Sequence, residues 1–301
     1  MEKIKIAFFG THKFAREILE NLSKNQKFDI KFVITQPDKP VGRKQEISKS
    51  PVKIFAEENK IPVFEPKSLK NFILPEKIDI GITAQYGLIL PEKILSEPKF
   101  GILNVHTSLL PKYRGASPIQ TALLNNEKIT GITIMKMDIG LDTGDILKQK
   151  EIIIDEDDTY PILEQKLIIL AQDFLAETIV DYIQGKITIN KQDETKATFC
   201  KQLDRNDGKI DFKNETSQNI YNKYRAFFPW PGIWAEWQGK RIKLLNIKPS
   251  KEKITAGEMK INTDKLFIGT ASSAIEIFEL QIEGKKSMTA QAFINGYKNL
   301  I

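Results

Sequence analysis

Residues 3–22 have the sequence KIKIAFFGTHKFAREILENL, and this stretch decides the fold. A mainly apolar run at residues 4–9 ends at Gly10. Apolar side chains then recur at helical spacing, at Phe14, Ile18, Leu19 and Leu22. A short apolar run followed by a glycine and then by a helical period predicts a strand, a turn and a helix in that order.

The same alternation of strands and helices continues to about residue 189. Strand-like runs lie at residues 30–34, 78–84, 102–106, 131–137 and 146–154. Ser50 and Ser117 each precede a proline, which predicts helices that begin there and continue to Lys60 and Leu124. A long helix with one apolar face is expected over residues 160–183, with Gly185 just after its end. Alternation of this kind is typical of an α/β domain with a mostly parallel sheet, which we assign to residues 1–189.

The chain changes character after this point. Residues 190–205 are polar and lack periodicity, which predicts a linker. Apart from one helical segment near residues 217–227, short strands separated by turns are expected from there on. They lie at residues 232–237, 241–247, 265–268 and 274–280. Such spacing is typical of a small barrel or sandwich, so residues 206–301 are expected to form a second domain.

Several kinds of chemistry are excluded by residues that the chain lacks. Its one cysteine, Cys200, can form neither an internal disulfide nor a CxxC zinc site, and His12 and His106 are too far apart for a local metal motif. The first turn holds one glycine where a dinucleotide-binding turn has three, and neither a P-loop nor a GxSxG elbow occurs. No apolar run reaches the ~20 residues of a membrane-spanning helix. We therefore expect a cytoplasmic protein with no membrane contact and no metal.

Charge is distributed unevenly along the chain. The formal net charge is +6, and residues 191–301 supply all of it, since residues 1–190 hold 26 basic and 26 acidic side chains. Residues 31–53 hold six basic and two acidic side chains, whereas residues 151–190 hold two and nine. Such segregation indicates a polyanionic partner, although solvated lysines in a generally basic chain would give the same pattern.

A group of polar residues lies between positions 104 and 145. Asn104 and His106 end a predicted strand, and both side chains point to one side at its carboxyl edge, where open parallel sheets bind ligands. The loop DIGLDTGD at residues 138–145 offers three carboxylates, one of which could reach the imidazole. An amide, an imidazole and a carboxylate suit acyl-type transfer to an amine, because the imidazole accepts the ammonium proton while the amide stabilises oxyanion charge. From spacing alone, a structural histidine beside a capped turn remains the commoner alternative.

Longer segments carry a resemblance to a known family. They are NVHTSLLPKYRGASPI at residues 104–119, GITIM at 131–135 and MDIGLDTGD at 137–145. Together they resemble the signature of the folate-dependent formyltransferases. Further matches extend over almost the whole chain and narrow the resemblance to the members that act on methionyl-tRNA. These are TQPDKPVGR at 35–43, SPVK at 50–53, YGLILP at 86–91 and RAFFPWPG at 225–232.

The resemblance implies a Rossmann-like formyltransferase domain followed by a small, OB-like β-barrel domain. It also implies that 10-formyltetrahydrofolate is the formyl donor and that the α-amine of initiator methionyl-tRNA is the acceptor in translation initiation. Asn104, His106 and Asp142 match the catalytic residues of the family. Ser108, Leu109, Leu110 and Pro111 match its folate-binding stretch, and the turn formed by Tyr86, Gly87, Leu88 and Ile89 is expected to line the pterin pocket.

Two groups of basic residues are expected to contact tRNA. In the resembling family the loop after the second strand meets the acceptor arm, which here implies Lys39, Arg43, Lys44 and Lys49. In the second domain, Lys240, Arg241 and Lys243 alternate with apolar neighbours, so we expect them to face outward and hold the RNA backbone. The protein is expected to act as a monomer.

Two other functions stay open. A formyltransferase for a small amine, such as a nucleotide sugar or glycinamide ribonucleotide, would need neither the basic loop nor the basic second domain. A non-catalytic RNA-binding protein that retains an inactive formyltransferase domain would not need Asn104, His106 and Asp142 together.

Overall fold

The computed structural model describes residues 2–41, 46–297 and 299. Within it the chain forms two compact units, neither of which is continuous in sequence. Unit 1 comprises Met1–Pro118, Ile129–Ile153 and Glu164–Lys201. Unit 2 comprises Ile119–Lys128, Ile154–Leu163 and Gln202–Ile301. Two short segments from the middle of the chain therefore belong to the same unit as the last hundred residues.

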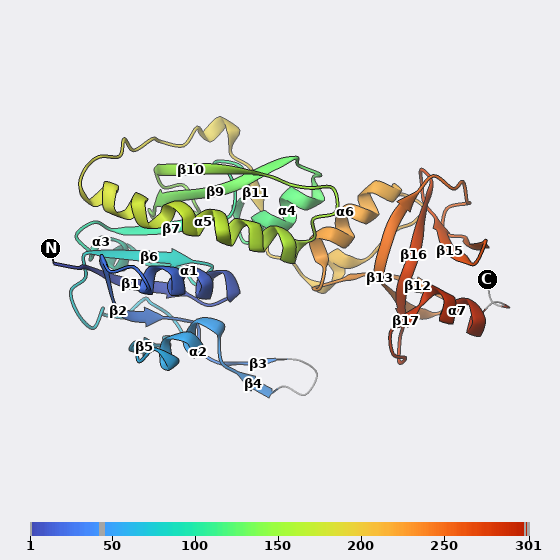
Figure 1. Ribbon diagram of the computed structural model, residues 1–301, viewed down its shortest axis with the longest axis horizontal. Coiled ribbons are helices and arrows are strands. Elements are labelled where there is room, and N and C mark those ends of the chain that lie inside the picture. The colour runs from blue at the N-terminus through green and yellow to red at the C-terminus, as the bar shows by residue number, and fades with distance from the viewer. Residues whose placement is uncertain (1, 42–45, 298, 300–301) are drawn as a thin grey trace. The chain divides into compact units, whose positions relative to one another are not determined.

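Unit 1 is built around a seven-stranded sheet with the strand order β10-β9-β7-β6-β1-β2-β5 (Figure 1). The five neighbouring strands β7, β6, β1, β2 and β5 run parallel to one another. At the other edge of the sheet, β9 is antiparallel to β7 and β10 is antiparallel to β9. Their bounds are β1 (Ile4–Gly10), β2 (Phe28–Ile34), β5 (Val63–Phe64), β6 (Ile80–Ala84), β7 (Ile102–His106), β9 (Ile129–Lys136) and β10 (Ile146–Ile153).

The core of unit 1 lies on both faces of β1. Ile6, Ala7, Phe8 and Phe9 are adjacent residues with no exposed surface, as expected of a central parallel strand that is covered on both sides. The helix α5 lies beside α1 (Figure 1), and the Gln172 amide on α5 donates a hydrogen bond to the Glu17 carbonyl on α1. The helices of unit 1 are α1 (Lys13–Ser23), α2 (Pro51–Glu58), α3 (Glu92–Ser96) and most of α5 (Tyr160–Ile183). The helix α4 (Pro118–Leu124) belongs almost entirely to unit 2.

Local sequence signals account for where these helices begin and end. Pro51 is the first residue of α2, and the Ser50 hydroxyl accepts a hydrogen bond from the Lys53 amide at 3.1 Å, as the serine–proline pair predicts. The helix ends at Glu58, two residues before the predicted Lys60. The predicted bounds of α5 are confirmed, and Gly185 follows with a left-handed φ of +69°.

Two short strand pairs complete unit 1. β3 (Lys39–Val41) and β4 (Glu46–Ser48) pair antiparallel. β8 (Arg114–Gly115) pairs in parallel with β11 (Phe199–Cys200), which follows the 3-10 helix η1 (Glu194–Lys196). Phe199 and Cys200, in the segment predicted as a linker, thus pair with a strand inside the motif at residues 104–119.

Unit 2 contains an antiparallel sheet with the order β12-β13-β16-β15-β14, and β17 pairs with β16 (Figure 1). Gln238 and Gly239 form a two-residue turn between β12 and β13, and both have a positive φ, which suits a tight hairpin. The elements are η2 (Arg205–Gly208), α6 (Ser217–Phe227), β12 (Ile233–Trp237), β13 (Lys240–Ser250), β14 (Met259–Asn262), β15 (Lys265–Gly269), β16 (Ala274–Ile282), β17 (Met288–Thr289) and α7 (Ala290–Tyr297).

The predicted fold class is confirmed: a mostly parallel, Rossmann-like sheet domain precedes a small antiparallel β domain. In the part of the chain that the structure describes, no helix is both long and apolar enough to span a bilayer.

A buried arginine joins three separate chain segments within unit 2. Arg225 on α6 is 2% exposed, and its guanidinium donates to the side-chain oxygens of Asn126 at 3.1 Å and Asn222 at 2.9 Å. It also donates to the Asp155 carbonyl at 3.4 Å. Burial lowers the pKa of Arg225, because the charged form is desolvated. These bonds connect α6 to the segments Ile119–Lys128 and Ile154–Leu163.

We expect Arg225→Ala to destabilise unit 2 by about 3 kcal/mol or more, because it removes a buried guanidinium and leaves its acceptors without a donor. Differential scanning calorimetry of the full chain measures this as a lower unfolding temperature. Asn219→Ala, at an exposed position on the same helix, is the control and should change stability by less than ~0.5 kcal/mol. Equal shifts for the two variants would contradict the role assigned to Arg225.

Candidate active site

The strand β7 places two polar side chains at the carboxyl edge of the unit 1 sheet. Asn104 is half-buried and His106, the last residue of the strand, is 6% exposed. The neighbouring strand β6 runs parallel to β7, with Thr83 paired to Asn104, so the chain leaves both strands at the same edge. This is the edge at which open parallel sheets bind ligands.

The loop between β9 and β10 brings a carboxylate to the same place. The Asp138 carboxylate shapes this loop by accepting from the Gly140 amide at 3.0 Å and from the Thr143 hydroxyl at 2.6 Å. Gly144 passes so close to the Lys136 carbonyl that a Cβ there would lie 1.8 Å from its oxygen. Asp142 has a left-handed φ of +52°. The loop is therefore held in one conformation by short-range contacts, including a glycine that no other residue can replace without a backbone shift.

Asn104, His106 and Asp142 meet in one cluster. The Asn104 amide donates to Asp142 Oδ1 at 3.3 Å, and the Gly115 backbone amide donates to Asp142 Oδ2 at 2.8 Å. The ring atom Nδ1 of His106 lies 3.7 Å from Asp142 Oδ2. Residues separated by 38 positions in sequence thus form a single amide–carboxylate–imidazole arrangement.

The tautomer of His106 follows from its other nitrogen. Nε2 lies 3.0 Å from the carbonyl oxygen of Tyr113, and a carbonyl can only accept a hydrogen bond. We therefore assign the proton of the neutral ring to Nε2, which leaves the lone pair on Nδ1. When Nδ1 takes up a proton, Asp142 is the carboxylate beside the new charge. The arrangement can accept one proton and stabilise the resulting imidazolium.

The residues from 108 to 111 directly follow this cluster. The Ser108 side chain is buried, and its hydroxyl donates to the Lys112 carbonyl at 2.6 Å. Leu110 is also buried, while Leu109 and Pro111 are half-buried. Thr133 on β9 fixes the segment, because its hydroxyl donates to the Ser108 carbonyl at 2.6 Å and accepts from the Leu110 amide at 3.0 Å.

The turn at residues 86–89 leaves the carboxyl end of β6. The Tyr86 carbonyl accepts from the Thr11 hydroxyl at 3.0 Å and from the Gln36 side-chain amide at 2.7 Å, so loops that follow three strands are joined at this edge. The Tyr86 ring is buried, which raises the pKa of its hydroxyl to about 12. Gly87 is exposed, Leu88 is half-buried and Ile89 is 89% exposed.

The basic residues predicted to contact tRNA lie on exposed elements, as far as they are described. Lys39 begins β3, and Lys49 forms an ion pair with Glu57 at 2.7 Å. Arg43 and Lys44 lie outside the described residues. On β13, Arg241 is exposed and Lys243 half-buried while Ile242 and Leu244 are buried, so residues 241–244 alternate as predicted. Lys240, directly before Arg241, is also exposed and lies outside this alternation. The Arg241 guanidinium stacks 4.1 Å from the centre of the Trp234 ring.

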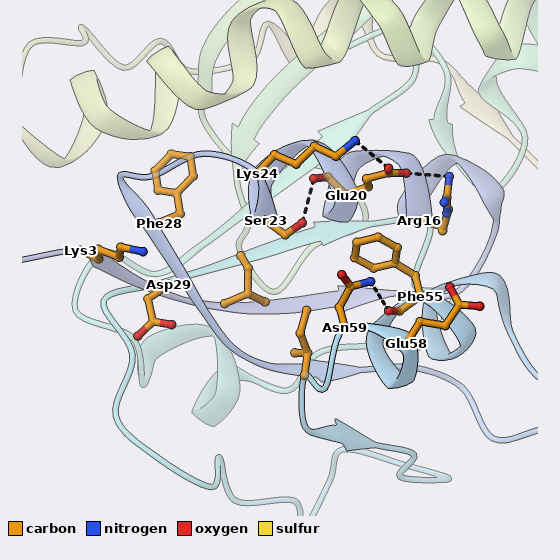
Figure 2. A pocket seen from close by; sticks show the side chains of 12 residues that line it. Lys3, Arg16, Glu20, Ser23, Lys24, Phe28, Asp29, Phe55, Glu58 and Asn59 are labelled. Atoms are coloured by element: carbon orange, nitrogen blue, oxygen red, sulfur yellow. Dashed lines mark hydrogen bonds and ion pairs between the residues drawn. The ribbon is translucent and has the colours of Figure 1, made fainter.

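A hollow elsewhere on unit 1 contains none of the predicted site residues (Figure 2). Three of its charged groups pair with one another: Glu20 accepts from Arg16 at 2.8 Å and from Lys24 at 2.7 Å. The Arg16 guanidinium also lies over the Phe55 ring. The lining of the hollow contains no amide–carboxylate–imidazole cluster like that of Asn104, His106 and Asp142. Among the described residues, no group of three or more His, Cys, Asp and Glu is placed to hold a metal ion.

Sequence reasoning missed two residues that support the site. Thr133 is fully buried in a mainly apolar strand, and a buried hydroxyl in such a strand is a signal that it bonds a neighbouring backbone. Gln192 lies in the segment predicted as a linker, and its side-chain amide donates to the Asp142 and Gly144 carbonyls at 2.8 and 2.7 Å. No local pattern in the sequence marks Gln192, because its partners are about 50 residues away.

Comparison with known proteins identifies the class first. Residues 3–179 match the family described as formyl transferase, and residues 202–298 match the formyl transferase C-terminal domain. A solved structure of a sugar 3N-formyl transferase, WlaRD, determined in the presence of dTDP and 5-N-formyl-THF, has a TM-score of 0.70 and 25% identity, and the match covers 95% of this chain and 100% of that one. The chain therefore belongs to the formyl transferase family.

Curated relatives narrow the class. The methionyl-tRNA formyltransferase of Caldicellulosiruptor saccharolyticus is 43% identical, over 97% of each chain. That of Thermodesulfovibrio yellowstonii is 41% identical, over 97% of this chain and 96% of the relative. The chain belongs to the methionyl-tRNA formyltransferase family.

We expect Gly115→Ala to destabilise the protein more than Gly185→Ala. Both glycines have a positive φ, and a left-handed backbone costs an alanine about 1–2 kcal/mol. At Gly115 the new Cβ would also lie 2.3 Å from the Cys200 carbonyl oxygen, whereas at Gly185 nothing lies within 4 Å. Denaturant unfolding of both variants measures the difference. Equal losses would show that β8 and β11 separate at no cost.

Proposed function

We propose that this protein transfers the formyl group of 10-formyltetrahydrofolate to the α-amine of initiator methionyl-tRNA. The observation that carries this proposal is the cluster of Asn104, His106 and Asp142 at the carboxyl edge of the sheet. It occurs in a chain whose curated relatives, at 43% and 41% identity, are methionyl-tRNA formyltransferases. The protein is expected to act in the cytoplasm, where initiator tRNA is charged, and to work as a monomer.

The chemistry follows from the position of each group. The methionyl amine attacks the formyl carbon, a C–N bond forms, and His106 Nδ1 receives the proton that the amine loses. One N–H of the Asn104 amide is bonded to Asp142, which leaves its second N–H to stabilise the negative charge that develops on the formyl oxygen. Asp142 stabilises the imidazolium. Collapse breaks the bond between the formyl carbon and the folate nitrogen, and the proton passes from His106 to that nitrogen.

Apolar surface near these groups supports a folate as donor. Ile139 and Leu141, on the same loop as Asp142, are 80% and 61% exposed, and Ile89 extends from the turn after β6. Exposed apolar side chains beside buried polar groups are typical of a site for a flat, partly apolar ring. The solved structure with 25% identity, which was determined with 5-N-formyl-THF, supports the same class of co-substrate.

Variants of the two central residues test the reaction. His106→Ala should slow single-turnover formylation by at least ~100-fold, because the proton acceptor is lost. Asp142→Asn should lower kcat strongly and change the dissociation constant for the folate only modestly, because the neutral amide no longer stabilises the imidazolium. Rapid-quench assays with charged initiator tRNA measure the rates. Near-normal transfer by His106→Ala would refute the assignment.

Basic residues on β13 test the acceptor. Lys240→Gln and Lys243→Gln should each weaken tRNA binding, and each should reduce the salt dependence by about one unit of slope if one phosphate contact is lost. Folate binding should not change. Lys93→Gln, the same change of charge at an exposed position on α3, is the control. Filter binding over a series of salt concentrations measures the slopes, and parallel slopes for all three variants would argue against β13 as an RNA contact.

A small-amine acceptor is the second candidate, because the solved neighbour at 25% identity is a sugar N-formyl transferase. The greater identity to the tRNA enzymes favours tRNA. Parallel assays with charged initiator tRNA and with a dTDP-amino sugar distinguish the two acceptors. If only the amino sugar is formylated, the acceptor is a small amine and the tRNA assignment is wrong.

A further inference from the structure

The segment after α5 folds back onto the loop that carries Asp142. Residues 190–201 belong to unit 1, together with β7 and the loop between β9 and β10. Within this segment, Gln192 and Glu194 contact the side chain of Arg114, which begins β8. Arg114 is 1% exposed, so this contact is made by a guanidinium that is almost fully removed from water.

Arg114 binds both partners with most of its N–H groups. Two guanidinium nitrogens donate to Gln192 Oε1, at 3.1 and 2.8 Å. Two donate to the Glu194 carboxylate, at 2.8 and 2.7 Å. The hydrogen bonds to Glu194, together with its charge, raise the pKa of Arg114 above its usual value despite the opposing effect of burial. The guanidinium therefore stays charged and holds the Gln192 oxygen firmly.

Arg114 in turn fixes the orientation of the Gln192 amide. Only the oxygen of an amide can accept from a guanidinium, so the NH₂ group must point the other way. There it donates to the Asp142 carbonyl at 2.8 Å and to the Gly144 carbonyl at 2.7 Å. Both N–H bonds of the amide are thus used, and both acceptors lie in the loop that carries the site carboxylate.

Asp142 needs this support more than an ordinary loop residue does. Its φ of +52° lies in the left-handed region, which a residue with a side chain occupies only at a cost. Its carboxylate must meet the Asn104 amide, the Gly115 amide and the His106 ring together. A rotation of the Asp142 backbone would break all three contacts. Such a rotation would also turn the Asp142 carbonyl group away from Gln192, so the hydrogen bond from Gln192 to this carbonyl opposes it.

We propose that Gln192, oriented by Arg114, is a positioning residue that holds the backbone of Asp142 so that its carboxylate stays against His106. The inference rests on the proposed function, in which Asp142 stabilises the imidazolium. Gln192 itself touches neither the imidazole nor the reacting groups. It acts only through Asp142, and this distinguishes its role from a general contribution to folding.

The primary test is Gln192→Met, which keeps the length of the side chain and removes both donors and the acceptor. We expect kcat for formyl transfer to fall by about tenfold to a hundredfold, since a displacement of about 1 Å at a site group costs that much. The KM for the folate should change by less than about twofold, because Gln192 does not contact that substrate. Gln184→Met, at an exposed position near the end of α5, is the matched control and should behave as the unaltered protein.

A double-mutant cycle separates positioning from structure. Gln192→Met should cause little further loss of kcat in a chain that already carries Asp142→Asn, because the group through which Gln192 acts is already disabled. A purely structural role would instead lower kcat by the same factor in both backgrounds, and that result would overturn the inference.

A second variant keeps the test decisive if Gln192→Met does not fold. Gln192→Glu preserves the size of the side chain and its bond to Arg114, but it sets a carboxylate oxygen against the two carbonyls. We expect the same loss of kcat in a protein that calorimetry shows to be folded at the assay temperature, with an unfolding temperature below that of Gln184→Glu because the new oxygen repels the two carbonyls. Normal kcat in either folded Gln192 variant would overturn the inference.

Failure of the inference can be told apart from failure of the proposed function. If the unaltered protein does not formylate charged tRNA, or if Asp142→Asn is fully active, the proposed function is wrong. If both behave as expected while the Gln192 variants match their controls, only the positioning role is wrong.

Discussion

The carboxylate of Asp142 receives hydrogen bonds from two different elements, and the arrangement of the site depends on this meeting. Oδ1 accepts from Asn104 on β7, and Oδ2 accepts from the Gly115 amide on β8 while facing the His106 ring. No single strand or loop could supply all these partners. The sheet order therefore matters chemically, because β9 lies beside β7, with Met135 paired to Asn104 and Thr133 paired to His106, and the Asp142 loop follows β9.

Polar side chains hold this arrangement in place through hydrogen bonds to the segments around it. Thr133 bonds the segment after His106, Gln192 bonds the loop of Asp142, and Arg114 bonds Gln192. Each of these groups is buried or bonded so that its donors face specific acceptors, and a buried donor without an acceptor costs about 1–3 kcal/mol. A displaced site would leave several such groups unsatisfied at once. Desolvation thus selects one geometry over nearby alternatives.

The sequence predicted the parts of this structure that depend on local patterns. Apolar period and caps predicted β7, α2 and α5, and side-chain alternation predicted that Asn104 and His106 share one edge of the sheet. Spacing alone left three carboxylates that could reach His106, and the family resemblance singled out Asp142, whose Oδ2 lies 3.7 Å from Nδ1 of the ring. The role of Gln192 could not be predicted from the sequence. Its partner Asp142 lies 50 positions away, and a polar segment without periodicity does not indicate which distant residues it contacts.

The interleaving of the two units also bears on how the chain acquires its structure during synthesis. Gln192 and β11 leave the ribosome after every residue of the sheet, so the loop of Asp142 is completed by the last residues of unit 1 to be made. The segment Ile119–Lys128 gains its contacts later still, because its partner Arg225 is synthesised about a hundred residues downstream. A nascent chain that already contains His106 and Asp142 is therefore still incompletely folded, and it exposes the apolar surface that makes partly folded chains depend on chaperones.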